Sequence, residues 1–262
     1  MRCQEDMVQV RAALDRGLTC REVEEQTGVP ASTVARWALG RTAAFGSGVE
    51  RRPRAPRRQY RRRPGWRPPD PPSYAYLLGL YLGDGCISIM PRTVGFQISL
   101  DAIYPEIIED AVTAMYLTLL PKTVHVWPVK NSRCMTVKSH CQAWLDAFPQ
   151  HGPGRKHERK IELADWQQAI VEKHTDWFLR GLIESDGCRT INRFKTKLPS
   201  GRVAEYAYPR YFFSNLSPDI RGLFCEACER LDIRWTLSNP RNISVSHRKS
   251  VAKLDAFVGP KA

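Results

Sequence analysis

The chain of 262 residues is long enough for one large domain or two modest ones, and its formal net charge is +13. This excess of positive charge indicates a polyanionic partner, most often nucleic acid, although a basic protein with an ordinary solvated surface has the same balance. No apolar run reaches the length needed to span a membrane. Eight cysteines without an N-terminal secretion signal favour a reduced, intracellular protein, which we expect to be cytoplasmic and associated with the nucleoid.

Residues 1–40 predict a small helical unit. Thr19 and Glu22 have the spacing of a capping box that begins one helix, and a further helix is expected at Ala31–Leu39. The stretch Leu18–Trp37 resembles the helix-turn-helix of resolvases and transposases, in which the last helix lies in the DNA major groove. The resemblance implies a DNA-facing set of Ser32, Thr33 and Arg36. A three-helix packing unit without DNA contact is the alternative.

Residues 41–72 predict a disordered linker. The segment holds ten Arg and seven Pro against one Glu and one Asp, a composition that cannot build a core. Its arginines are expected to bind phosphates independently of sequence and with strong salt dependence. The candidate DNA-binding residues in this run are Arg57, Arg58, Arg61, Arg62 and Arg63. A merely solvated tether is the alternative.

Two stretches farther along are copies of each other. Leu77–Gly85 reads LLGLYLGDG and Leu179–Gly187 reads LRGLIESDG, and each pattern predicts a helix that ends at Asp-Gly, with the glycine in a left-handed conformation. Small residues four apart lie on one helix face and allow two helix backbones to approach closely. We therefore expect the two helices to pack face to face, with Asp84 and Asp186 together at one end.

The expected position of these aspartates is electrostatically unfavourable. A helix C-terminus carries partial negative charge, and two neighbouring carboxylates repel each other. A bound divalent cation removes both problems, and oxygen ligands of this kind suit Mg²⁺, Mn²⁺ or Ca²⁺. An Asp-Gly turn after a buried helix, without any metal, is the alternative interpretation.

The paired motifs resemble those of LAGLIDADG homing endonucleases. The final Asp-Gly is intact in both copies, whereas the acidic sixth position of the family motif is Leu82 in the first copy and Glu184 in the second. The resemblance implies metal binding by Asp84 and Asp186 and by the backbone carbonyls that precede them. It also implies a lysine near the end of the second hairpin of each repeat. The carbonyls are those of Gly83 and Ser185, and the lysines are Lys138 and Lys249. His247 and Arg248 compete with Lys249 for this position, and a merely solvated side chain is the alternative for Lys138.

The elements around the motifs repeat in the same order. The predicted fold class is α+β, with two αββαββα repeats in a pseudo-two-fold arrangement at residues 73–148 and 175–262, preceded by the all-α unit. The linker at 149–174 is expected to hold a flexible basic bridge at 151–156 and a helix at 161–171. Leu145-Asp146-Ala147-Phe148 and Leu254-Asp255-Ala256-Phe257 match independently of the motifs and support a duplication.

Alternation along the predicted strands suggests where DNA binds. Side chains of a strand point alternately to the two faces of the sheet, and one parity of the strand after the second motif is cationic. A curved sheet with a polar, basic face fits a major groove. The candidate DNA contacts are Gln97, Arg189, Arg193, Lys195 and Lys197, although an ordinary half-exposed sheet has a similar pattern.

Together these features predict a monomeric, site-specific endonuclease that hydrolyses the phosphodiester bonds of double-stranded DNA with Mg²⁺ or Mn²⁺ as cofactor. A DNA-binding transcription regulator that uses the same fold without cutting remains open, as does an RNA maturase.

Overall fold

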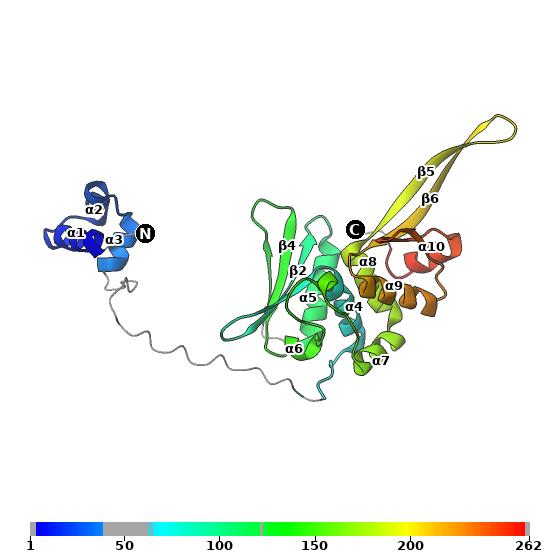
Figure 1. Ribbon diagram of the computed structural model, residues 1–262, viewed down its shortest axis with the longest axis horizontal. Coiled ribbons are helices and arrows are strands. Elements are labelled where there is room, and N and C mark those ends of the chain that lie inside the picture. The colour runs from blue at the N-terminus through cyan, green and yellow to red at the C-terminus, as the bar shows by residue number, and fades with distance from the viewer. Residues whose placement is uncertain (1–3, 39–62, 64, 121–122, 260–262) are drawn as a thin grey trace. The chain divides into compact units, whose positions relative to one another are not determined.

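The computed structural model describes residues 4–38, 63, 65–120 and 123–259, which form two compact units (Figure 1). The smaller unit contains α1 (Gln4–Asp15), α2 (Cys20–Thr27) and α3 (Ala31–Ala38). The predicted capping box is confirmed, because Thr19 accepts from the Glu22 amide while the Glu22 carboxylate accepts from the Thr19 amide. Helix α2 ends at Gly28 in a left-handed conformation (φ 66°). Buried aliphatic side chains from all three helices form the core of this unit: Val10, Ala13, Val23, Val29 and Val34.

The first half of the larger unit has the predicted order αββαββα. It contains α4 (Pro71–Gly83), β1 (Gly85–Ile89), β2 (Val94–Asp101), α5 (Pro105–Leu119), β3 (Val124–Pro128), β4 (Cys134–His140) and α6 (Trp144–Ala147). Its strands form an antiparallel sheet in the order β1-β2-β4-β3. Alternate residues of β2 are buried against the helices, and the intervening ones face away.

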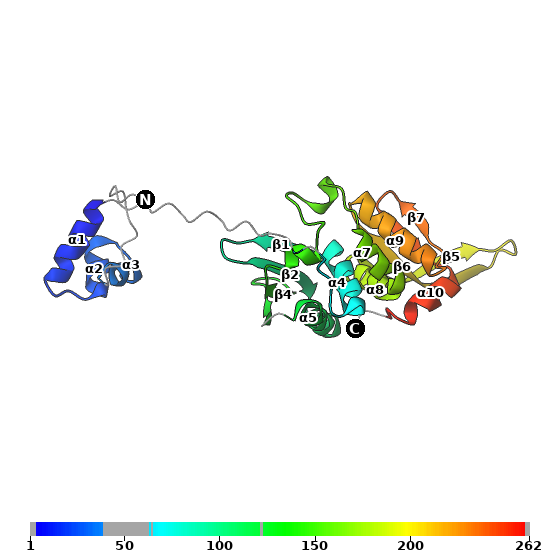
Figure 2. The ribbon, with the colours of Figure 1, turned by 90° about the horizontal axis from the view of Figure 1, so that it is seen from below.

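The second half repeats this order. Its elements are α8 (Thr175–Asp186), β5 (Gly187–Lys197), β6 (Val203–Ser214), α9 (Pro218–Arg230), β7 (Thr236–Asn239), β8 (Asn242–Val245) and α10 (Arg248–Asp255). The sheet order β5-β6-β8-β7 matches that of the first half. The predicted α+β fold with two repeats is therefore confirmed. One continuous hydrophobic core joins the halves, and α4 and α8 lie side by side between the two sheets (Figures 1 and 2).

The segment between the repeats is more ordered than its composition predicted. It contains the short 3-10 helix η1 (Lys156–Glu158) and α7 (Asp165–Lys173). Arg159 donates to the carbonyl oxygens of Gln150 and Gly154 at 3.2 and 3.1 Å. The helix expected at 161–171 is present as α7, whereas the bridge at 151–156 is less flexible than expected, because Arg159 binds one backbone carbonyl just before it and another within it.

The C-terminal end of the predicted linker also belongs to the larger unit. The Trp66 ring packs edge-on against Trp166 at a centroid distance of 5.5 Å, and Arg67 lies over the Trp166 ring at 5.2 Å. The Arg63 amide donates to Asp146 at 2.8 Å. Among the described residues, no helix is both long and apolar enough to cross a membrane.

Candidate nucleic-acid and metal site

The site begins at the contact between α4 and α8. A Cβ atom added to Gly181 would lie 2.2 Å from the carbonyl oxygen of Tyr76, and one added to Gly79 would lie 2.5 Å from that of Phe178. No side chain fits in these gaps, so the two backbones touch where the sequence places its small residues. The face-to-face packing predicted from the motif spacing is confirmed.

The same contact brings the ends of the two motifs together. A Cβ added to Gly83 would lie 2.2 Å from Ser185 Oγ and 3.1 Å from Asp186 Oδ2. Ser185 Oγ donates back to the carbonyl of Gly181 at 3.0 Å, so its hydroxyl serves its own helix. Asp84 follows α4 directly and is exposed, whereas Asp186 is half-buried.

The glycines after the aspartates do not have the conformation that the sequence suggested. Gly187 is extended (φ −107°, ψ 168°), and Gly85 is absent from the described glycines with positive φ. Both begin strands instead. They are required for space, because a Cβ on Gly85 would lie 2.5 Å from Tyr81 Cα and one on Gly187 would lie 2.7 Å from the Ile183 carbonyl oxygen.

The sixth motif positions are structural. Leu82 is fully buried in the core, and Glu184 is 6% exposed. Glu184 accepts from the Tyr76 hydroxyl at 2.5 Å and from Arg180 Nε at 2.7 Å, and Arg180 also binds Asp110 on α5. Burial raises the pKa of Glu184, while the hydrogen bonds from Tyr76 and Arg180 oppose that rise. Glu184 thus ties α8 to α4 and, through Arg180, to α5.

Two clefts flank the motif ends, and each combines one aspartate with the residue that precedes the other aspartate. A cleft of about 380 Å³ is lined by Gly83 and Asp186, and a smaller one of about 140 Å³ is lined by Asp84 and Ser185. We call them the Asp186 cleft and the Asp84 cleft. This crosswise arrangement follows from the approximate two-fold relation of the helix pair.

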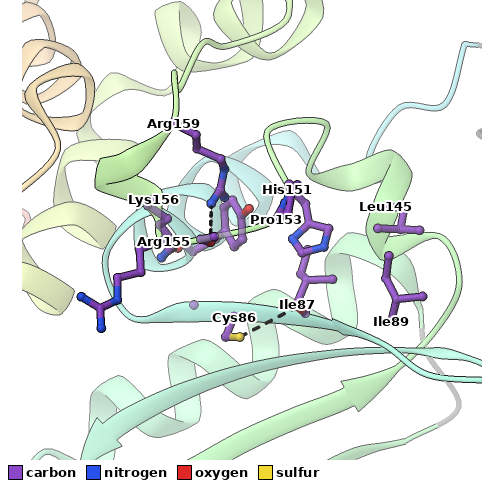
Figure 3. A pocket seen from close by; sticks show the side chains of 13 residues that line it. Cys86, Ile87, Ile89, Leu145, His151, Pro153, Arg155, Lys156 and Arg159 are labelled. Carbon is purple, nitrogen blue, oxygen red and sulfur yellow. Dashed lines mark hydrogen bonds between the residues drawn. The ribbon is translucent and has the colours of Figure 1, made fainter.

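Lys156, which the sequence analysis did not single out, lies at the Asp186 cleft. Its ammonium donates to the carbonyl oxygens of Tyr81, Leu82 and Gly83 at 2.5, 3.1 and 2.7 Å. Burial lowers the pKa of Lys156 to about 8, and the attraction of Asp186 and Asp84 opposes this change. Lys156 also borders a cavity of about 820 Å³ on its other side, together with Cys86, His151 and Arg159 (Figure 3).

The two clefts differ in their suitability for a divalent metal. The Asp84 cleft is lined by three acidic residues, Asp84, Asp101 and Glu184, and its lining includes no Lys or Arg. In the Asp186 cleft, Asn215 Nδ2 donates to Asp186 at 2.5 Å, and Lys156 engages the Gly83 carbonyl. Hard oxygen donors therefore fit Mg²⁺ or Mn²⁺ in the first cleft better than in the second. Nowhere in the described part of the chain do three or more His, Cys, Asp or Glu side chains form a cluster able to hold a metal.

The two lysines predicted from the resemblance lie at or after the ends of the second hairpins. Lys138 is two residues before the end of β4, opposite Gln97 on β2 and His125 on β3, so these three share the open face of the sheet. Lys249 is exposed in the first turn of α10, after the strand end at which it was expected. Their catalytic roles stay predictions.

Gln97 lies on the open face of the first sheet, but the candidate DNA contacts of the second sheet all have the strand parity of Arg189. Arg189 lies opposite Tyr211, which is buried, and it binds Asp255 of α10 at 2.7 and 3.0 Å. Arg189 is therefore on the helix side of the sheet, and the prediction that its face is open to DNA was wrong at that residue. The open side at the base of β5 and β6 carries Thr190 and Arg210 instead.

Beyond Thr190 the hairpin of β5 and β6 projects past the rest of its sheet (Figures 1 and 2). Phe194, Tyr206 and Tyr208 pack on one face of this arm, with centroid distances of 5.4 to 6.0 Å. The predicted contacts are exposed and alternate with Phe194 along β5, so they lie on the other face of the arm: Arg193, Lys195 and Lys197. Lys195 forms an ion pair with Glu205 across the hairpin.

The remaining DNA-binding predictions fall on the smaller unit and on the arginine run. In α3, Ser32 and Arg36 are exposed and Thr33 is half-buried. Arg63 is exposed as well. The other candidates, Arg57, Arg58, Arg61 and Arg62, lie outside the described residues.

Comparison with known proteins gave structural matches only. No family model matches the sequence, and no curated protein matches it. A structure of I-DmoI in complex with DNA and Ca is similar with a TM-score of 0.47 and 16% identity, covering 71% of this chain and 89% of that one. The LAGLIDADG meganuclease I-AabMI bound to uncleaved DNA has a TM-score of 0.43 and 13% identity, covering 70% and 82%. The I-LtrWI LAGLIDADG homing endonuclease bound to target DNA has a TM-score of 0.45 and 9% identity, covering 72% and 84%.

Proposed function

We propose that this chain is a site-specific, divalent-metal-dependent endonuclease that hydrolyses phosphodiester bonds of double-stranded DNA. The observation that carries the proposal is the pairing of the two Asp-Gly motifs. Two helices in direct backbone contact end together, and each final aspartate shares a cleft with the residue before the other aspartate. A buried structural helix pair gains nothing from carboxylates at its negative ends.

In this proposal Asp84 and the carbonyl of Ser185 would hold the metal in the Asp84 cleft. The chemistry supplied by a divalent ion there would be polarisation of the phosphoryl oxygens and a lower pKa for a bound water. Glu184 keeps α8 in position through Tyr76 and Arg180 and is not a ligand. Lys156 places a fixed positive charge on the opposite side of the helix pair, where it attracts the phosphate backbone.

The open sheet faces support the DNA part of the proposal. Gln97 and Lys138 lie side by side on the first sheet, and Arg210 and Asn192 lie on the same face of the hairpin in the second. Amide and guanidinium groups of this kind read adenine and guanine edges in the major groove. Two unequal repeats in a single chain read an asymmetric site without dimerisation, in keeping with a monomer.

The alternative is a DNA-binding regulator that does not cut. One observation favours it: Lys156 and Asn215 satisfy the Gly83 carbonyl and Asp186 without any metal. An RNA maturase would share the basic surface but would prefer folded RNA over duplex DNA.

The experiment that separates these functions is cleavage of a randomised duplex DNA library by the full-length protein in Mg²⁺. We expect staggered cuts at a recurring long site, and none when EDTA replaces Mg²⁺. Selective binding of one duplex sequence without cuts in Mg²⁺ or Mn²⁺ would overturn the nuclease and support the regulator. Preferential retention of structured RNA would support the maturase.

A further inference from the structure

Lys156 has an unusual set of partners for a lysine. A protonated lysine has three N–H donors, and here the Lys156 ammonium donates to three successive carbonyls at the end of α4. These carbonyls are the groups that a helix leaves without an internal partner at its C-terminus. The motif resemblance implies that the Gly83 carbonyl binds a metal. The Lys156 ammonium occupies the place of that metal beside the carbonyl oxygen.

The carboxylate on the same side is engaged as well. Asn215 Nδ2 donates to Asp186 Oδ2 at 2.5 Å, and the Asn215 side-chain oxygen accepts from the Ser217 amide at 2.8 Å, which fixes the amide orientation. A metal entering here would have to displace the Lys156 ammonium from the Gly83 carbonyl and break the hydrogen bond from Asn215. The Gly83 carbonyl and Asp186 Oδ2 thus both already accept hydrogen bonds from protein donors.

The charges of the residues that line the two clefts also disfavour a metal in the Asp186 cleft. The lining of the Asp186 cleft contains Arg155, Lys156 and His157 against a single carboxylate, Asp186. No basic residue lines the Asp84 cleft, and of its three carboxylates Asp101 pairs with Arg133 at 3.7 Å and Glu184 with Arg180 at 2.7 Å. The cationic lining of the Asp186 cleft therefore repels a divalent cation more strongly than the lining of the Asp84 cleft does, because charges within a few ångströms interact strongly at a partly buried site.

We infer that Lys156 takes the place of a divalent metal in the Asp186 cleft, so that of the two clefts at the motif ends only the Asp84 cleft binds a metal ion. The two motif ends are related by an approximate two-fold axis, but they differ in metal binding because Lys156, from the segment between the repeats, lies at only one of the two clefts. This inference deepens the proposed function and rests on it for the reaction, although the difference between the clefts is a property of the protein alone.

Metal stoichiometry tests the inference without any need for cleavage. Mn²⁺ binding to the full-length chain is measured by isothermal titration for the wild type and for Lys156→Met, which keeps the side-chain length and removes the charge. We expect Lys156→Met to bind one Mn²⁺ more per chain than the wild type, and Lys156→Met combined with Asp186→Asn to lose that extra ion. Equal stoichiometry in the wild type and Lys156→Met would overturn the inference.

Lys160→Met is the matched control. Lys160 lies in the same segment, is 74% exposed and pairs with Glu162 at 2.5 Å, away from the helix ends. Its replacement removes the same charge from the chain and should leave Mn²⁺ stoichiometry unchanged. An extra ion in Lys160→Met would show that net charge alone controls binding and would contradict the role given to Lys156.

A second measurement uses the wild type and does not depend on how well a variant folds. Anomalous scattering from Mn²⁺-soaked crystals should show a peak beside Asp84 and Ser185 and none beside Gly83 and Asp186. A peak at Gly83 and Asp186 would overturn the inference. Failure of the nuclease proposal would appear differently, as an absence of DNA cleavage with the stoichiometry difference intact.

Discussion

The replacement Gly181→Ala tests the helix contact on which the whole site depends. The added Cβ would lie 2.2 Å from the Tyr76 carbonyl oxygen and 3.1 Å from Gly79 Cα. Backbone atoms cannot change rotamer to relieve this overlap, so α4 and α8 must separate by ~1 Å. This separation loses a large part of the dispersion energy along their contact. Overpacking of this kind costs about 1–3 kcal/mol even when side chains can adjust. At the upper end of that range, and after the gain of about 1 kcal/mol that alanine brings to a helix, we expect a net loss of about 2 kcal/mol.

Gly222→Ala is the control for that helix-propensity gain. Gly222 lies within α9, and a Cβ there would meet nothing within 4 Å. Urea denaturation should therefore show Gly222→Ala slightly more stable than the wild type and Gly181→Ala much less stable, with a lower melting temperature by several degrees. Equal effects of the two substitutions would refute the close backbone contact. Cleavage by Gly181→Ala below its melting temperature should also fall, because the motif ends move apart.

Three further predictions concern Glu184, Asp255 and the N-terminal part of the chain. Glu184→Gln should lower the free energy of unfolding by about 2 kcal/mol, because it weakens a buried charged network, and leave Mn²⁺ stoichiometry unchanged. Loss of a bound ion in a folded Glu184→Gln protein would instead make Glu184 a ligand. The hydrogen bonds from Arg189 hold the pKa of Asp255 below its usual value, so its contribution to stability is present above the unfolded pKa and is lost as the pH falls through the folded pKa. Acid titration of wild type and Asp255→Asn should therefore show stability curves that converge in acid, whereas a constant gap would contradict the ion pair. Deletion of residues 1–62 should weaken DNA binding and flatten its dependence on salt concentration, and an unchanged salt slope would remove the arginine run from the interface.

Much of the fold follows from local patterns in the sequence. The spacing of Gly79, Gly83 and Gly181 was enough to predict a close helix pair, since small residues four apart have few other uses at a helix contact. Alternation along β2 predicted its buried and open faces, and the repeated order of elements predicted the second half from the first.

The parts that sequence reasoning missed depend on contacts between distant segments. The glycines after the aspartates suggested a left-handed helix end, but they are required because Tyr81 and Ile183 leave no room for a Cβ. Arg189 shares its strand parity with exposed cations, but the sequence could not show that this parity faces the helices at the base of the sheet, where Asp255, 66 residues away, binds Arg189. Lys156 was one cation among many in a basic segment, and no local signal separates it from its neighbours. The Gly152-Pro153-Gly154 sequence just before Lys156 predicts a turn, which reverses the chain direction, but it does not predict which side chain contacts the end of α4.

The measurement that tests the central claim most directly is cleavage of the selected DNA site by Asp84→Asn and Asp186→Asn, assayed beside the wild type in Mg²⁺ with DNA binding measured in parallel. If the Asp84 cleft holds the metal, Asp84→Asn should lose cleavage while it retains binding to the same site, and Asp186→Asn should be affected less, because Lys156 and Asn215 occupy its cleft. Cleavage at the wild-type rate by Asp84→Asn would contradict the account and leave Asp84 as a structural helix end.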